Sequence, residues 1–448
     1  MNNVIDLVDE IHFLGEQATG TSNLLQCVWV YDRGIDIDGL RRFNNHLQRG
    51  RLARRIERSP LPFGRHRWVS PDRSPDIEIA EFACPRVEFD TWLDEQAGTP
   101  LDAEHGPEWR LAVLPFTDGG AGISFVISHC LTDGVGLCEA LADAALGHDD
   151  AITWPAAASR SRFRALREDA HQITRDVPAI GRAVVAVARA VRSNRGRGAS
   201  VSTPRVPIAG SDETVSLTTT TVFVDAEDWD TRAQALGGTS NALLAGVAAR
   251  LALRLGRVAG DGQAVMAIPV NNRARGDARA NAITGIEITA DPVLATTNLR
   301  EIRNATKRAL IHRQEVPDER FALLPIVPLL PQWVLKRMVS LVVGEAITGA
   351  SNVGTLSRAV NRPDGHDADR FAITLRYPHM TAATMHRTGG LLNAISGRTR
   401  GQVFISVTAY QPSASNYALQ QLLSDILEDF SLHCTTNWHR REPAIASR

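Results

Sequence analysis

The chain has 448 residues, more than one hydrophobic core usually serves, so we expect two domains. Hydrophobic residues make up 44% of the sequence and charged residues 22%, which is typical of a soluble globular protein. The formal net charge is −1, so charge gives no reason to expect a nucleic-acid partner.

Cysteine usage and the most apolar segments bear on the compartment. The five cysteines are scattered and form no CxxC pair, so we expect neither a zinc site nor a disulfide framework. The first fifteen residues hold Asp6, Asp9 and Glu10 and lack a basic region, unlike a signal peptide. Residues 321–347 are apolar but are broken by three prolines, a lysine and an arginine, unlike a membrane span. These features predict a cytoplasmic protein.

The first half of the chain predicts alternating strands and helices. Residues 24–31 are β-branched and aromatic, as in a strand, and residues 38–48 show helical spacing of Leu40, Phe43 and Leu47. Residues 123–128 form a short apolar run of strand length, followed by a polar connector and a helical pattern over 135–146. A connector of this kind places polar side chains at the end of a sheet, facing a cleft.

The middle of the chain changes character. Arginines are frequent from residue 159 to 197, and Pro178 suits the first position of a helix over 179–191. Residues 196–210 are rich in Gly, Ser and Pro, as in a loop. We therefore divide the chain into an N-terminal subdomain (1–175), a basic helix with linker (176–212) and a C-terminal subdomain (213–448).

The second half repeats the irregular alternation of strands and helices. Its predicted strands are 214–224, 264–270, 371–376 and 403–409, and its predicted helices are 239–255 and 415–430. Such an order predicts an α+β fold with mixed α/β layers in both halves.

One segment carries chemistry. His129 leaves the predicted strand 123–128, and Asp133 and Gly134 follow it just before a helix. An imidazole titrates near neutrality, so it can take a proton from an attacking hydroxyl or amine and return it to a leaving thiolate. Asp133 would orient the loop by pairing with an arginine. Gly134 would permit a backbone geometry closed to other residues and leave room for substrate at the helix N-terminus. The amides there would help to stabilise a tetrahedral oxyanion. Asp133 and Gly134 also fit a plain helix-start turn.

The spacing His129-x-x-x-Asp133-Gly134 resembles the active-site signature of the acyltransferase superfamily related to chloramphenicol acetyltransferase. This superfamily includes wax ester synthase/diacylglycerol acyltransferases, polyketide-associated acyltransferases and condensation domains. Further segments resemble its motifs in the expected order: 99–110 before the histidine strand, 269–273 at a later strand end with Asn281 after it, and 351–354 at a turn. Ser128 stands where many members have a first histidine.

The resemblance implies a fold of two α/β sandwich subdomains with a central tunnel. His129 would sit midway in the tunnel as the general base, with donor and acceptor entering from opposite faces. The resemblance also implies that Asp133 is structural and that Arg273 is its ion-pair partner. Asn352 is a candidate for contact with substrate in the tunnel, although it fits a turn-forming role at least as well.

The predicted function is transfer of an acyl group from a thioester donor, acyl-CoA or an acyl carrier protein, to a hydroxyl of a lipid or natural-product acceptor. We expect no metal and no bound cofactor, because acyl-CoA or acyl-phosphopantetheine serves as a co-substrate. Two alternatives stay open. One is a condensation-like enzyme that forms amides from a carrier-bound donor, and the other is a non-catalytic scaffold that binds carriers. His129 and Asp133 argue against the scaffold, which needs no base.

The basic segment 179–197 has two interpretations. Arg182, Arg189 and Arg192 share one side of a helix, opposite an Ala/Val surface. A basic amphipathic helix can rest on an anionic membrane, which would make the protein membrane-peripheral. A surface helix packed on the body of the protein is the favoured interpretation.

Overall fold

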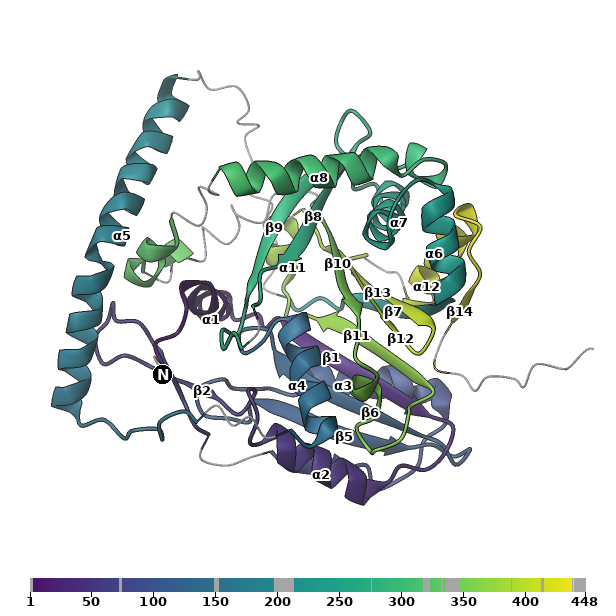
Figure 1. The fold of residues 1–448 in the computed structure, drawn as a ribbon, viewed down its shortest axis with the longest axis horizontal. Coiled ribbons are helices and arrows are strands. Elements are labelled where there is room, and N and C mark those ends of the chain that lie inside the picture. The colour runs from purple at the N-terminus through teal and green to yellow at the C-terminus, as the bar shows by residue number, and fades with distance from the viewer. Residues whose placement is uncertain are drawn as a thin grey trace, which may run out of the picture.

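The computed structural model describes residues 3–71, 75–148, 153–196, 213–274, 276–316, 323–331, 333–335, 347–387, 389–411, 415–436 and 438, with only the backbone for 187–196 and 387. Within these residues the chain forms two large mixed sheets with helices packed on them (Figure 1). The predicted mixed α/β class is therefore confirmed.

Five described strands form the sheet of the N-terminal lobe. In order across the sheet they are β11 (Arg370–Arg376), β1 (Leu24–Tyr31), β6 (Ala121–Ser128), β5 (Trp109–Pro115) and β4 (Ile77–Ile79). All eight residues of β1 and of β6 are buried, which explains why both read as nearly continuous apolar runs. Helix α3 (Phe89–Gly98) packs on β5 and β6, and α2 (Ile37–Leu47) packs on α4 (Gly134–Leu146).

Seven described strands form the sheet of the C-terminal lobe. In order they are β14 (Cys434–Thr436), β7 (Thr218–Asp225), β13 (Gln402–Ala409), β12 (Leu392–Thr399), β10 (Thr348–Thr355), β8 (Ala264–Asn271) and β9 (Ile283–Ala290). The helices of this lobe are α6 (Ala226–Ala235), α7 (Ser240–Arg254), α8 (Arg300–Glu315) and α12 (Asn416–Asp429). Helix α7, capped by Thr239, is buried along most of its length against β8, β10 and β12.

Smaller elements complete the described chain. They are α1 (Leu7–Thr19), α5 (Arg162–Gly196), α11 (Ala382–Arg387), the pair β2 (Arg55–Glu57) and β3 (Arg67–Val69), and the 3-10 turns η1 (Arg86–Glu88), η2 (Leu294–Thr296), η3 (Leu324–Leu329) and η4 (Arg358–Asn361). Helices α1 and α5 both contact η3. Figure 1 shows α5 running along one side of the molecule.

Strand β11 corrects the predicted division of the chain. The boundary at 213 assigns residues 370–376 to the C-terminal subdomain, yet β11 pairs antiparallel with β1 in the N-terminal sheet. The strand also contacts β12 and β13. Phe371 of β11 and Phe404 of β13 meet edge to face, with ring centroids 5.9 Å apart. The two lobes therefore share a core at this strand, because the chain crosses back to complete the first sheet.

Helix α5 corrects the predicted role of Pro178. The proline lies inside a helix that begins at Arg162, rather than at the start of a helix over 179–191. Proline removes one backbone donor, but the turns on both sides are held by buried Ala165, Asp169 and Ala183. The predicted linker falls mostly on residues 197–212, which lie outside the described residues, as does most of the apolar stretch 321–347. In the described part of the chain, no helix combines the length and apolar character needed to cross a membrane.

Candidate active site

His129 lies where β6 ends, at the junction of the two lobes. Its backbone N–H donates to the carbonyl of Asn23 (2.7 Å), and its own carbonyl accepts from Nδ2 of Asn281 (3.0 Å). Its ring atom Nδ1 is buried and has no hydrogen-bond partner among the described residues. Burial lowers the pKa of His129, although the negative charge of Asp133 acts in the opposite direction. The imidazole is therefore neutral at pH 7.

Asp133 is held by donors from both lobes. Its Oδ1 accepts from the N–H of Gly136 (2.6 Å), which makes it the N-cap of α4. Its Oδ2 lies 2.7 Å from Nη2 of Arg273 and accepts from the N–H of Ala282 (2.8 Å). The Asp133 and Arg273 side chains are 1% and 2% exposed, so the two charges of this ion pair are desolvated together. All of these contacts hold the turn that carries His129, and none of them is made to the imidazole ring.

The segment 277–282, between β8 and β9, fastens the C-terminal lobe to the His129 turn. The N–H of Asp133 donates to the carbonyl of Ala280 (3.0 Å), and Nη2 of Arg273 donates to the same carbonyl (2.9 Å). From the N-terminal lobe, Asp9 of α1 accepts from the N–H groups of Ala280 (3.0 Å) and Asn281 (2.7 Å). Arg54 donates through Nη1 to the carbonyl of Ala278 (2.7 Å).

Gly134 lies in a confined space and has an ordinary backbone. It is the first residue of α4 and has no left-handed φ, so the predicted unusual backbone geometry is wrong. A Cβ at Gly134 would lie 3.0 Å from Cγ1 of Val353, in the other lobe. At Gly136 a Cβ would lie 2.8 Å from Nη2 of Arg273, so a larger residue would displace the ion pair. The N–H groups of the first turn of α4 have no acceptor within the helix. Asp133 accepts from one of them, that of Gly136.

Asn352 belongs to β10, so the predicted turn over 351–354 is a strand with a register shift before Thr355. Its side-chain amide is fully used. Nδ2 donates to Oδ1 of Asn241 (2.6 Å), and Oδ1 accepts from the N–H of Gly354 (2.8 Å). These bonds tie β10 to α7 beside the register shift of the strand, and contact of Asn352 with substrate stays a prediction.

Helix α1 brings three residues to the site that the sequence motifs did not reveal. The ring of His12 stacks on the ring of His129, with centroids 5.3 Å apart and planes inclined by 19°. Glu16 accepts from Oγ of Ser128 (3.1 Å) and from the N–H of Asn23 (3.1 Å). Together with Asp9, these residues follow i, i+3, i+7 spacing and share one helix face. No local pattern in the sequence links this face of α1 to the His129 turn, because its partners Ser128 and Ala280 lie 112 and 271 positions away.

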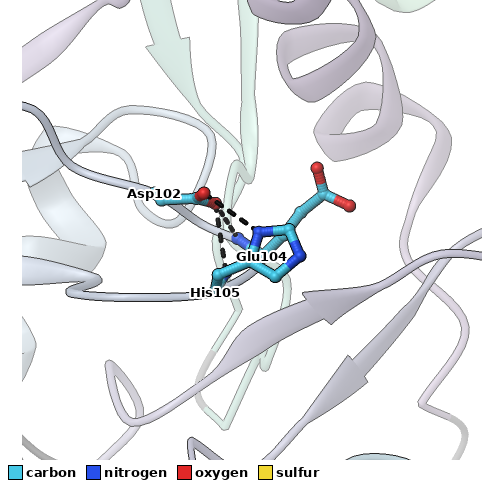
Figure 2. A group of neighbouring side chains, drawn as sticks. All are labelled: Asp102, Glu104 and His105. Carbon is cyan, nitrogen blue, oxygen red and sulfur yellow. Dashed lines mark hydrogen bonds and ion pairs between the residues drawn. The ribbon is translucent and has the colours of Figure 1, made fainter.

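One cluster away from the His129 turn has the composition of a metal site. Asp102, Glu104 and His105 offer ligand atoms within 4.8 Å of one another, and they are the one such group in the described chain. Figure 2 shows Asp102 joined to His105 by its hydrogen bonds. Oδ1 of Asp102 accepts from the N–H groups of Glu104 (2.7 Å) and His105 (3.1 Å), while Glu104 pairs with Arg58 (2.6 Å). These contacts account for the arrangement of the three side chains as a turn.

Solved structures share this architecture over nearly the whole chain. The first condensation domain of the calcium-dependent antibiotic synthetase, in complex with a substrate analogue, has a TM-score of 0.57 at 14% identity, covering 96% of each chain. A variant of the starter condensation domain of rhizomide synthetase, in complex with C8-CoA, has a TM-score of 0.53 at 16% identity, covering 96% of this chain and 95% of that one.

A wax ester synthase/diacylglycerol acyltransferase from Marinobacter aquaeolei VT8 is similar as well. Its TM-score is 0.53 at 15% identity, covering 96% of this chain and 100% of that one. No protein-family model matches the sequence, and no curated protein matches it. Likeness at these identities establishes the fold. The chain therefore has the two-lobed fold shared by condensation domains and wax ester synthase/diacylglycerol acyltransferases, as its motifs predict.

Proposed function

We propose that the protein is an acyltransferase in which His129 acts as the general base. The observation that carries the proposal is the placement of a neutral imidazole at the junction of the lobes, on a turn that both lobes hold. Since Nδ1 is buried and Asp133 is occupied by Gly136, Arg273 and Ala282, Nε2 is the nitrogen left to act on substrate.

The proposed reaction needs no chemistry beyond the imidazole and the backbone. Nε2 of His129 accepts the proton of the acceptor hydroxyl while its oxygen attacks the thioester carbonyl. The resulting oxyanion is stabilised by N–H groups at the start of α4. Collapse of the tetrahedral intermediate breaks the carbon–sulfur bond, and the thiolate takes the proton back from His129. Asp133 and Arg273 keep the turn in place and do not touch substrate.

The donor is a thioester, acyl-CoA or an acyl carrier protein, and the acceptor is a hydroxyl of a lipid or natural product. Binding of C8-CoA by a starter condensation domain of the same fold supports an acyl-CoA donor. An amine acceptor is the second candidate, because condensation domains share the fold and the same base serves either nucleophile. The tunnel between the lobes and a cytoplasmic site of action stay predictions.

A peripheral membrane contact through 179–197 also stays a proposal. Within the described part of α5, Arg182 is exposed, and Val184 and Val185 are 54% and 47% exposed. Exposed valines beside an exposed arginine support contact with an anionic lipid surface. The side chains of Arg189 and Arg192 lie outside the described residues. Buried Ala183 shows that the helix also packs on the body of the protein.

The proposal is tested by acceptor-dependent release of free thiol from a panel of acyl-CoAs, with alcohols and amines as acceptors. We expect His129→Ala to lower kcat by at least about a hundredfold, because the proton of the acceptor loses its base. His148→Ala is the matched control, because His148 is exposed just beyond the end of α4 and lies outside the site. It should keep wild-type rates.

Two outcomes would overturn this assignment. Wild-type turnover by a folded His129→Ala variant would remove His129 from its role. Failure of the wild-type protein to release thiol from either CoA or carrier thioesters, with any acceptor, would favour the carrier-binding scaffold. Ester or amide products, identified by mass spectrometry, separate the two enzymatic candidates.

A further inference from the structure

Helix α1 is fixed against the His129 turn at both ends of one face. At its first turn, Asp9 accepts from the N–H groups of Ala280 and Asn281. Two turns later, Glu16 accepts from Oγ of Ser128, the residue directly before His129, and from the N–H of Asn23. The carbonyl of Asn23 also accepts from the N–H of His129 (2.7 Å). The backbone of Asn23 therefore contacts both Glu16 of α1 and the residue proposed as the base.

His12 lies between these two anchors, on the same helix face. Its ring packs nearly parallel to that of His129, with a 5.3 Å separation of centroids and a 19° inclination. Nδ1 of His129 has no hydrogen-bond partner in the described chain, so no hydrogen bond at that nitrogen fixes the rotation of the ring. The stacked ring of His12 packs on one face of the His129 ring and limits that rotation.

We propose that His12 is a positioning residue for His129, whose ring packs on the imidazole of the base and fixes the plane in which Nε2 meets substrate. This inference deepens the proposed function and rests on it for the reaction itself. His12 does not touch the reacting atoms. It acts through the base, by restricting one torsion and by covering one face of the ring.

The charge state of the pair agrees with this role. Burial, followed by the neighbouring His129, lowers the pKa of His12 to about 3, so His12 stays neutral while His129 accepts a proton. The charge of Asp133 acts on both rings and opposes the effect of burial on their pKa values. The other titratable or charged side chains of the site are Asp9, Glu16, Arg54, Cys130 and Arg273.

The test compares His12→Ala with His12→Phe. The alanine variant uncovers the ring of His129 and admits water, so the pKa of His129 should rise toward its ordinary value near 6.5. The acidic limb of the pH–rate profile should move to higher pH with it. We expect kcat to fall about tenfold with KM changed less than about threefold, since ring orientation matters most in the transition state. Phenylalanine keeps the stacked face and should restore both the limb and kcat.

The pKa of His129 is also measured without turnover, by NMR titration of 13Cε1-labelled histidine assigned with His129→Gln. This readout separates the inference from the proposed function, because it holds whether or not acyl transfer is found. Gln17→Ala, an exposed change on α1, is the control for effects on the helix itself. An unchanged titration of His129 in His12→Ala would overturn the inference. So would a His12→Phe variant as impaired as His12→Ala, which would assign the ring nitrogens of His12 to the chemistry.

Discussion

The carboxylate of Asp133 accepts from donors in both lobes. Its charge therefore holds the His129 turn in place and takes no direct part in the proposed acyl transfer. Removing one partner of a buried ion pair leaves the other charge uncompensated, at a cost of about 3–5 kcal/mol. An asparagine at this position keeps an acceptor for Gly136. Its second group is a donor, so it can accept from neither Arg273 nor Ala282, which both contact Oδ2 of Asp133. The residue therefore contributes to catalysis through the stability of the turn.

We predict that Asp133→Asn lowers the free energy of unfolding by about 3 kcal/mol and lowers activity with it. Urea unfolding followed by circular dichroism measures the loss. Asp38→Asn is the matched control, because the Asp38–Arg41 pair is exposed on α2 and should contribute little. A variant with wild-type stability and only slower turnover would instead give Asp133 a direct part in the reaction.

Glu16 of α1 holds the helix against the His129 turn and is also an acid whose pKa is changed by burial. Burial raises the pKa of Glu16 from 4.5 to about 7, despite hydrogen bonds from Asn23 and Ser128. In the folded state Glu16 holds its proton more tightly than in the unfolded chain. The stability that it contributes is therefore complete below pH 4.5 and is lost as pH rises through about 7.

The change in the free energy of unfolding caused by Glu16→Gln should consequently be more favourable to the folded state at pH 8 than at pH 5. The expected difference is about 2 kcal/mol, because glutamine keeps the acceptor oxygen without the charge. Unfolding free energies of variant and wild type at both pH values give this difference directly. Equal effects at pH 5 and pH 8 would show that Glu16 is ionised at neutral pH and that its charge is compensated.

How far the sequence predicts these elements depends on local pattern. Strand β1 was predicted to the residue, and α7 and α12 to within one residue at each end, because apolar periodicity and the caps Thr239 and Ser415 are local signals. Strand β10 was interpreted as a turn. Its glycines, serine and asparagine are poor strand formers, and its conformation comes from parallel neighbours β8 and β12.

The same limit applies to the site. His129 and Asp133 were found because their spacing is local, and Arg273 because a second motif carries it. His12 and Asp9 were missed, since a contact such as Asp9 with Ala280 joins residues 271 positions apart and leaves no local pattern. Helix α5 shows the converse case. Pro178 is a strong local signal for the start of a helix, but the tertiary packing of α5 overrides it and the helix runs through the proline.

At the scale of the whole molecule, the lobes are interdependent. Strand β11 completes the N-terminal sheet from a position late in the chain, and its pairing with β1 covers a strand whose residues are all buried. Segment 277–282 carries backbone bonds from the C-terminal lobe to the His129 turn. Neither lobe is therefore complete when the chain is divided near residue 200.

We predict that residues 1–196 expressed alone are insoluble or aggregated, because β1 becomes an unpaired apolar edge strand. The control is the full chain with a protease site inserted within 197–212 and cut after folding. Its two pieces should elute together in size-exclusion chromatography, because β11 and segment 277–282 still bridge them. A soluble, monomeric 1–196 fragment that unfolds cooperatively in urea would contradict this view. It would show that the N-terminal lobe folds without β11 and acquires the strand only when the second lobe docks.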